Sequence, residues 1–158
     1  MRAAQLATDT EQVVLKGDFM TSRNKQANLL IRIVGVAAIL FGILTIKEGG
    51  SVLFWSEAAR LAAGQYVPFV LWFNFLAGFF YVIAGAGLWA GRRWAATLAL
   101  MIAGATIAVF IAFGVHISAG GEYEPRTIVA MLLRSGVWVV ISLLARRFLI
   151  RSGKETSA

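Results

Sequence analysis

The 158-residue sequence contains no cysteine and only one histidine, His116. The absence of cysteine excludes disulfide relays, thiolate metal sites and iron–sulfur clusters within this chain. A single histidine also excludes a bis-histidine haem held by one chain. Catalytic triads, phosphate-binding loops and paired carboxylates inside apolar segments are missing as well, so the sequence predicts no catalytic residue and no particular cofactor.

The first 25 residues lack the continuous apolar core of 7–15 residues that a cleavable signal peptide requires. We therefore expect the first apolar helix, which begins near Ala27, to act as an uncleaved signal anchor. Residues 1–26 are expected to form a partly disordered N-terminal segment on the cytoplasmic side.

What the sequence does contain is four long apolar segments, and 59% of its residues are hydrophobic. Each segment is close to the roughly 20 residues that a helix needs to cross a hydrocarbon core about 30 Å thick. No acidic residue lies inside any of them. The sequence therefore predicts an all-α fold, an integral membrane four-helix bundle over residues 27–150, followed by a cytoplasmic tail of residues 151–158. The expected helices are 27–46, 67–90, 94–117 and 127–150.

The positive charge is concentrated on one side of these segments. Eleven lysines and arginines lie at or near the two termini and the 91–93 turn, whereas Lys47, Arg60 and Arg126 lie on the other side. By the positive-inside rule, both termini face the cytoplasm and loops 47–66 and 118–126 face outward. The richness in alanine, glycine and arginine is typical of a bacterial inner membrane. Because the basic residues form no separate soluble module, nucleic acid is not an expected partner despite the net charge of +7.

Five arginines at the predicted cytoplasmic side are expected to contact anionic lipid headgroups, each worth about 1 kcal/mol. They are Arg92, Arg93, Arg146, Arg147 and Arg151.

The first outer loop carries apolar residues at three- and four-residue spacing over residues 51–63. This pattern predicts a short amphipathic helix, with Ser51 as its cap and Gly64 at its end. The helix is expected to lie in the outer interface. The alternative is a lid that folds back over the mouths of the long helices.

Small residues recur on three of the predicted helices and mark surfaces where backbones approach closely. The rows are Gly35, Ala38 and Gly42; Gly78, Gly85 and Gly87; and Gly104, Ala108 and Ala112. Packing within the bundle is the expected role of these rows, and an oligomer interface is the alternative.

Arg134 lies about 10 Å inside the fourth helix at 1.5 Å per residue. An arginine at that depth costs a few kcal/mol, so it should face the bundle interior and find a partner. Thr127, Met131, Arg134, Trp138 and Ser142 share one helix face, which is expected to point inward. A buried ion pair is the expected structural role, with Glu48, Glu57, Glu122 or Glu124 as the possible partner, and a ligand or ion path is the alternative.

The other polar residues toward the outer half are Asn74, Tyr81 and His116. Asn74 is expected to form an interhelical hydrogen bond. It shares a helix face with Gly78, Tyr81 and Gly85, and this face is expected to meet the third helix near His116. His116 is interpreted as a hydrogen-bonded residue at a helix end. A copper or haem site formed by His116, Glu122, Glu124 and Met131 is a weaker alternative, because no ligand-spaced motif supports it.

Three stretches carry a resemblance to known proteins: residues 66–78 (YVPFVLWFNFLAG), residues 91–96 (GRRWAA) and residues 116–134. They resemble a group of small uncharacterised bacterial inner-membrane proteins, and the general layout is similar to that of DoxX-like four-helix proteins. The resemblance implies the architecture over most of residues 27–150. It implies no catalytic residue.

Three functional hypotheses follow. The first is a non-enzymatic accessory or assembly component that acts through helix packing, as a homo-oligomer or as a subunit of a larger membrane complex. The second is a small oligomeric transporter or channel, with a polar path past Asn74, His116 and Arg134. The third is a membrane redox protein that binds a metal or a quinone near His116 and Tyr81.

Overall fold

The structure is a computed structural model that describes residues 2–150. Met1, Arg151 and the predicted tail lie outside the described residues. The chain divides into two compact units, Met1–Leu30 and Ile31–Ala158. In the first unit, residues 2–30 are α-helical and belong to helix α1 (Arg2–Gly50). This helix therefore begins well before residue 27, where the apolar segment led us to expect its start.

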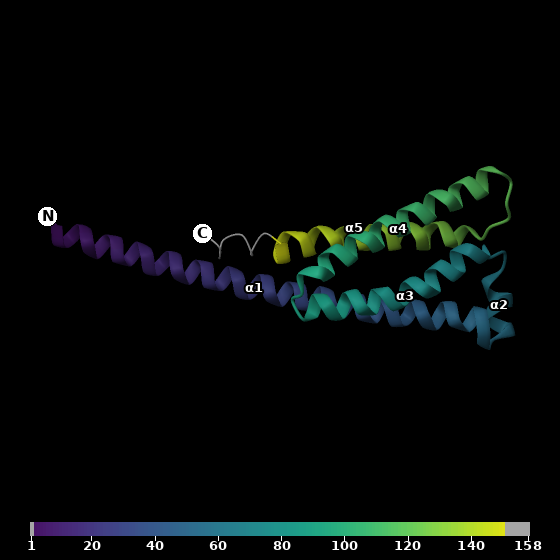
Figure 1. Ribbon diagram of the computed structural model, residues 1–158, viewed down its shortest axis with the longest axis horizontal. Coiled ribbons are helices and arrows are strands. Elements are labelled where there is room, and N and C mark those ends of the chain that lie inside the picture. Colours follow the sequence, from purple (N-terminus) through teal and green to yellow (C-terminus); the bar gives the residue numbers. More distant parts are fainter. Residues whose placement is uncertain (1, 151–158) are drawn as a thin grey trace. The chain divides into compact units, whose positions relative to one another are not determined.

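The second unit holds the rest of α1 and all other elements (Figure 1). After α1 come the π-helical turn η1 (Ser51–Trp55), α2 (Glu57–Ala63), α3 (Pro68–Trp89), α4 (Arg93–Ser118), α5 (Pro125–Ala145) and the π-helical turn η2 (Arg146–Ile150). In the described part of the chain, four helical spans are long and apolar enough to cross a membrane. They are Lys25–Trp55, Pro68–Trp89, Arg93–Ser118 and Pro125–Leu149. The predicted all-α membrane bundle is thus confirmed.

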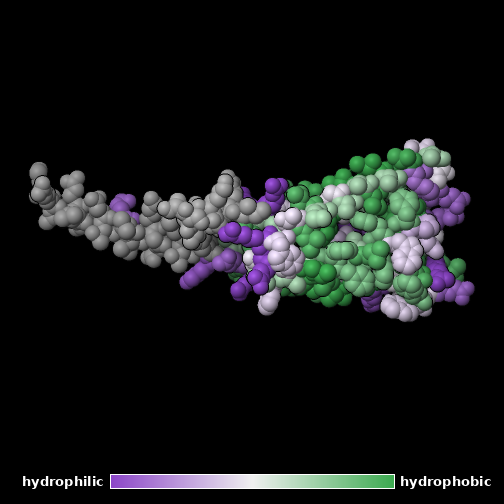
Figure 2. Space-filling view, viewed as in Figure 1, coloured by the Kyte–Doolittle hydropathy of each residue, from purple (hydrophilic) through white to green (hydrophobic). Residues whose placement is uncertain are grey.

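The surface of the second unit fits a lipid environment. Figure 2 shows a broad hydrophobic band over this unit, with hydrophilic residues at both of its ends. Large side chains such as Ile111, Leu132 and Leu133 are more than 60% exposed within the band. Exposed apolar surface on this scale is stable only against another apolar phase, so the chain is a multi-pass integral membrane protein in contact with lipid.

The helix ends follow from local sequence. Pro68 and Pro125 occupy the first turns of α3 and α5, where a missing N–H costs nothing. Gly91 closes α3 in the left-handed conformation (φ +65°), and the amides of Gly91 and Arg92 donate to the carbonyls of Leu88 and Gly87 at 3.0 and 2.9 Å. This pair of bonds is a Schellman cap, which turns the chain directly into α4.

Helices α1 and α3 pack backbone to backbone through glycines. A Cβ added at Gly35 would lie 2.7 Å from the carbonyl oxygen of Gly85, and one at Gly42 would lie 2.8 Å from that of Gly78. The seven-residue spacing within each pair, 35–42 and 78–85, keeps the glycines on one face over two turns. The expected packing role of these rows is confirmed.

The row on α4 behaves differently. Gly104, Ala108 and Ala112 are all exposed, and a Cβ added at Gly104 would meet nothing within 4 Å. The expectation that this row packs within the bundle is therefore wrong. The inner face of α4 is formed instead by Ala95, Ala99 and Thr106, all fully buried. These residues lie on the opposite side of the helix, and they too are small, so the helix has two rows that allow close approach.

Candidate functional site

The end of the bundle that carries η1 and α2 contains a pocket of about 480 Å³. Helices α1, α3 and α5 form its walls, and η1 and α2 also line it. Its polar side chains come from α1, η1, α3, α5 and the α2–α3 connection. They are Thr45, Glu48, Ser51, Tyr66, Asn74, Arg126, Thr127 and Arg134. The remaining lining is apolar, so the pocket combines a few polar groups with hydrocarbon walls.

Arg134 occupies the buried side of this pocket and is only 9% exposed. One of its terminal nitrogens donates a hydrogen bond to the hydroxyl of Thr45 at 3.4 Å, and its guanidinium carbon lies 5.7 Å from the centre of the Phe41 ring. The Nε atom is buried and has no hydrogen-bond partner among the described residues. A neutral hydroxyl and an aromatic face stabilise a cation only in part. The guanidinium therefore retains unused capacity to bind an anion.

The expected ion pair of Arg134 is not formed. Among the side chains that the structure describes over residues 25–149, the one ion pair joins Arg126 Nε to Glu124 Oε1 at 4.0 Å. Glu124 caps the start of α5, ten residues before Arg134, which is about 15 Å along a helix. Glu57 and Glu122 are exposed. Glu48 lines the same pocket as Arg134 but lies beyond ion-pair distance.

The predicted inward face of the last helix is confirmed. Met131, Trp138 and Ser142 are buried along with Arg134, and Thr127 is half-buried at the pocket wall. On the other side of α5, large apolar residues such as Leu132 and Leu133 are exposed. The four-, three- and four-residue spacing of the polar face is thus what directs Arg134 into the bundle.

Asn74 lines the pocket from α3, and its side-chain oxygen is buried without a hydrogen-bond partner among the described residues. The expected face of α3 meets α1 through Gly78 and Gly85, rather than the third membrane helix near His116. The difference arises because the glycines allow α1 to approach most closely on that side. Asn74 is therefore a pocket residue, and no interhelical hydrogen bond of its side-chain oxygen is formed.

Tyr81 lies in the core and does not line the pocket. Its ring stacks on Phe41 at 5.7 Å between centroids and packs on Trp138 at 4.6 Å. Phe41 thus contacts both Tyr81 and Arg134. Tyr81 supports the arginine indirectly, by holding the ring over which the guanidinium lies.

His116 and Met131 are also placed away from the pocket. His116 ends α4, where its Nε2 lies 3.2 Å from the carbonyl oxygen of Glu122 and its ring packs against Phe69. Met131 is fully buried with Phe113 and Val70 in a separate apolar cluster. Neither residue lines the pocket, although Met131 shares the inward face of α5 with Arg134. Among the described residues, no group of three or more His, Cys, Asp or Glu side chains is placed to hold a metal ion.

Helix α2 is attached over the pocket by polar contacts. The hydroxyl of Ser56 accepts a hydrogen bond from the amide of Ala59 and caps the helix, while Ser51 of η1 instead donates to the carbonyl of Glu48 in α1. The predicted cap at Ser51 is therefore wrong, because the chain turns at Ser56 and divides the expected helix into η1 and α2. Gly64 ends α2 as predicted.

Two arginines complete this attachment. Arg60 donates to the carbonyls of Val52 and Leu53 at 2.9 and 3.2 Å, which ties α2 to η1. Arg126 of α5 donates to the carbonyl of Ala62 at the last turn of α2, where a cation is favoured by the helix dipole. Arg60 joins α2 to η1 and Arg126 joins it to α5, so α2 forms a roof that is held to both elements.

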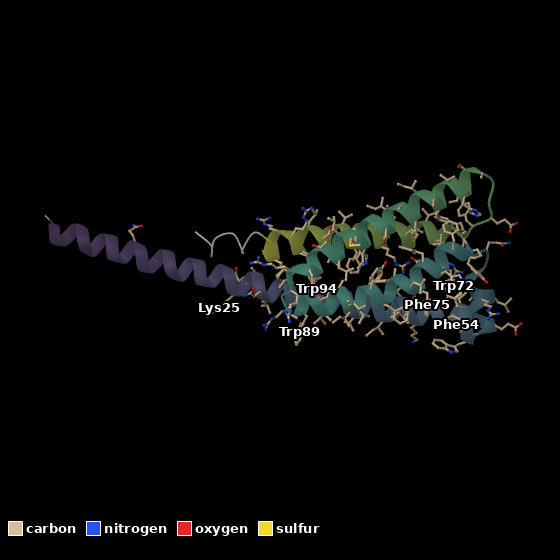
Figure 3. All side chains as sticks on the ribbon, viewed as in Figure 1. Lys25, Phe54, Trp72, Phe75, Trp89 and Trp94 are labelled. Atoms are coloured by element: carbon tan, nitrogen blue, oxygen red, sulfur yellow. The ribbon has the colours of Figure 1, made fainter. Side chains whose placement is uncertain are left out.

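The opposite end of the bundle carries the other predicted lipid contacts. Arg92, Arg93, Arg146 and Arg147 are exposed there. Trp89 and Trp94 flank the α3–α4 turn and are also exposed, at the end of α3 opposite to Trp72 and Phe75 (Figure 3). Arginines beside exposed tryptophans are typical of a membrane–water interface.

The sequence did not predict that Thr45 and Phe41 contact Arg134. Thr45 is the one hydroxyl residue in the first apolar segment, and it follows Ala38 and Gly42 at the spacing of a buried face. That spacing was available as a signal for Thr45. Nothing in the sequence distinguished Phe41 from the other aromatic residues.

No family model, curated protein or solved structure matches this chain, so the resemblance to DoxX-like proteins stays a prediction.

Proposed function

We propose that this integral membrane protein binds an anionic ligand in the outer pocket, with Arg134 as the charged contact. The proposal includes a bacterial inner membrane, with both termini in the cytoplasm and the pocket at the outer side. The charge distribution supports this orientation, because the end with Arg92, Arg93, Arg146 and Arg147 is the more basic one.

The observation that carries the proposal is a buried arginine beside a pocket with no carboxylate at ion-pair distance among the described residues. Burying a charge in a membrane protein costs at least a few kcal/mol, and structural arginines recover that cost by pairing. Arg134 offsets that cost only through one long hydrogen bond to Thr45 and the contact with Phe41. An anionic ligand would supply the missing charge and a partner for Nε.

Transport is a use of this site that the geometry supports only in part. Asn74 and Arg134 line one pocket, as the path hypothesis requires, whereas His116 lies outside it. The redox hypothesis has less support, because Tyr81 packs on Trp138 in the core whereas His116 packs on Phe69 at the end of α4. Ligand binding is therefore the function proposed, and any transport would begin from the bound state.

The test is native mass spectrometry of the protein extracted mildly from its own membrane. The proposal expects a bound mass that is retained in the wild type and lost in Arg134→Gln. The matched control is Arg32→Gln, which removes an equal charge from an exposed arginine of α1. If wild-type protein carries no bound mass, or if both variants lose it equally, ligand binding at Arg134 is wrong.

A second candidate function is that of an accessory or assembly component acting through helix packing. One observation favours it: the small-residue row Gly104, Ala108 and Ala112 faces outward, with open space around Gly104. In lipid, such a row allows a second helix to approach closely. This candidate needs no ligand, and the two proposals are compatible.

The absence of cysteine makes this second candidate easy to test. Ala108→Cys should form a disulfide-linked dimer in the native membrane, or a link to a partner protein that also has a cysteine there. Leu133→Cys, at an exposed position among large residues on α5, is the control and should remain monomeric. Equal crosslinking at both positions would indicate random collision and would remove this candidate.

A further inference from the structure

The lining of the outer pocket indicates the class of its ligand in more detail than the charge of Arg134 alone. We infer that the ligand is an anionic amphiphile of the outer half of the bilayer, with a single acidic headgroup and an apolar body. This inference rests on the proposed function and specifies the class of ligand. Three independent features of the pocket support it: its size, its charge and its position.

The size argues against a small inorganic anion. The pocket holds about 480 Å³, whereas one water takes about 30 Å³ of liquid volume. A phosphate or carboxylate group needs the space of only a few waters, so most of the pocket would remain to be filled. Volumes of 300–1,000 Å³ are typical of sites for organic ligands of substantial size.

The chemistry of the lining matches a molecule with two different parts. Arg134 and Asn74 present a cation and a buried amide oxygen on the inner side. Val67, Val70 and Leu71 of the α3 segment form hydrocarbon wall nearby, and α2 adds only the methyl groups of alanines. Hydrocarbon walls contribute favourably only when they bury an apolar surface. A fully hydrated ion would leave that contribution unused.

The charge of the lining sets the charge of the headgroup. Arg134 and Arg126 contribute two positive charges and Glu48 contributes one negative charge, which leaves a formal charge of +1. Arg126 is also engaged with Glu124 and with the carbonyl of Ala62. A group with one negative charge, such as a phosphodiester or a carboxylate, therefore neutralises the pocket, whereas a dianion would face the Glu48 carboxylate uncompensated.

The position of the roof places the pocket at headgroup depth. Trp55 of η1 is 74% exposed and Leu61 of α2 is 79% exposed, so both roof elements present large apolar side chains outward. Phe54 of η1 packs on Trp72 and Phe75 of α3, with ring centroids 5.7 and 5.6 Å apart (Figure 3). An aromatic cluster with exposed apolar residues at a helix end is typical of the interface between hydrocarbon and water. A bilayer amphiphile can therefore reach the mouth of the pocket at this depth, and its acidic group extends inward to Arg134.

The test titrates the intact protein in detergent with three soluble probes and counts bound molecules by native mass spectrometry. The probes are short-chain phosphatidylglycerol, short-chain phosphatidylcholine and inorganic phosphate. We expect one phosphatidylglycerol per chain, bound at least tenfold more tightly than either other probe. Arg134→Gln should weaken that binding at least tenfold, and Arg32→Gln, at an exposed arginine of α1, should change it less than twofold. Circular dichroism and thermal unfolding of each variant confirm that it is folded.

The other outcomes are separable. If inorganic phosphate binds as tightly as phosphatidylglycerol, and does so only with Arg134 present, the amphiphile inference is wrong while the proposed anion site stands. If phosphatidylcholine binds as well as phosphatidylglycerol, or if Arg134→Gln changes nothing in a folded protein, both proposals are wrong. Arg134→Lys adds a second check, because it keeps the charge but loses the planar geometry for a two-oxygen contact and should bind with intermediate affinity.

Discussion

The contact between α1 and α3 permits a sharp mutational prediction. A Cβ added at Gly85 would lie 2.7 Å from the carbonyl oxygen of Gly35 and 2.8 Å from the amide nitrogen of Ile39. Ordinary contacts begin at about 3.4 Å, so Gly85→Ala must separate the two backbones by about 0.7 Å. Side chains can rotate away from an added methyl group, but these two atoms belong to the backbone of a helix. The whole helix pair must therefore move.

The magnitude follows from the cost of overpacking. Inserting a methylene into a well-packed core costs about 1–3 kcal/mol, and a radial gap of 0.5–1 Å forfeits a quarter to a half of each dispersion contact along the interface. Alanine also has a higher helix propensity than glycine, by about 1 kcal/mol in water. Gly104→Ala is the matched control, because it gains the same propensity at a position with nothing within 4 Å.

The expected result is that Gly85→Ala unfolds with a free energy about 1–3 kcal/mol lower than that of Gly104→Ala. The propensity term cancels in this comparison, which leaves the cost of the close approach. Equilibrium unfolding in mixed detergent micelles, followed by circular dichroism, measures the difference. Equal free energies for the two variants, within about 0.5 kcal/mol, would refute the argument that the glycines set the distance between α1 and α3.

Three further predictions concern the pocket and its roof. Arg134→Leu should leave the free energy of unfolding unchanged or raise it by about 1–4 kcal/mol, because the burial cost of an incompletely paired charge disappears; a large loss of stability in the same micelle assay would indicate a structural partner. Ser56→Ala should remove the cap of α2, worth about 1 kcal/mol, and speed hydrogen exchange of its amides roughly fivefold. Arg126→Gln should also speed exchange in α2, through loss of the bond to Ala62, but leave exchange in α3 unchanged.

The sequence was sufficient to predict the bundle because the bilayer imposes a simple rule on it. Each apolar segment is long enough to span the membrane, and every backbone polar group must be paired within its own helix. The inward direction of Arg134 was predictable for a similar reason. Its neighbours at positions 127, 131, 138 and 142 repeat at helical spacing, and the polar face can be accommodated only inside the bundle.

The packing of the small-residue rows was less predictable. The rows at Gly35, Gly78 and Gly104 look alike in sequence, since each allows close approach of another helix. Which of them meet depends on the rotation of each helix about its own axis, and α4 offers the buried Ala95 and Ala99 on its other side. That choice is a property of the assembled bundle and cannot be read from one helix at a time.

The fold also decides that Arg134 pairs with none of the glutamates and that the 51–63 segment is divided at Ser56. Four glutamates were available in sequence, but Glu48, Glu57 and Glu122 are exposed and Glu124 is held beside Arg126. The 51–63 segment has a continuous amphipathic pattern, yet the chain must turn to bring α2 over the pocket. Ser56 can serve at that turn because its hydroxyl replaces a lost backbone partner.

The claim that Arg134 holds an anionic ligand is tested most directly by an experimental density map of the protein kept in its own lipid. The account predicts density in the outer pocket, with an acidic group within hydrogen-bond distance of the Arg134 guanidinium and an apolar portion along Val67 and Val70. A map in which the pocket is closed, or in which Arg134 pairs with Glu48 or another carboxylate of the protein, would contradict it.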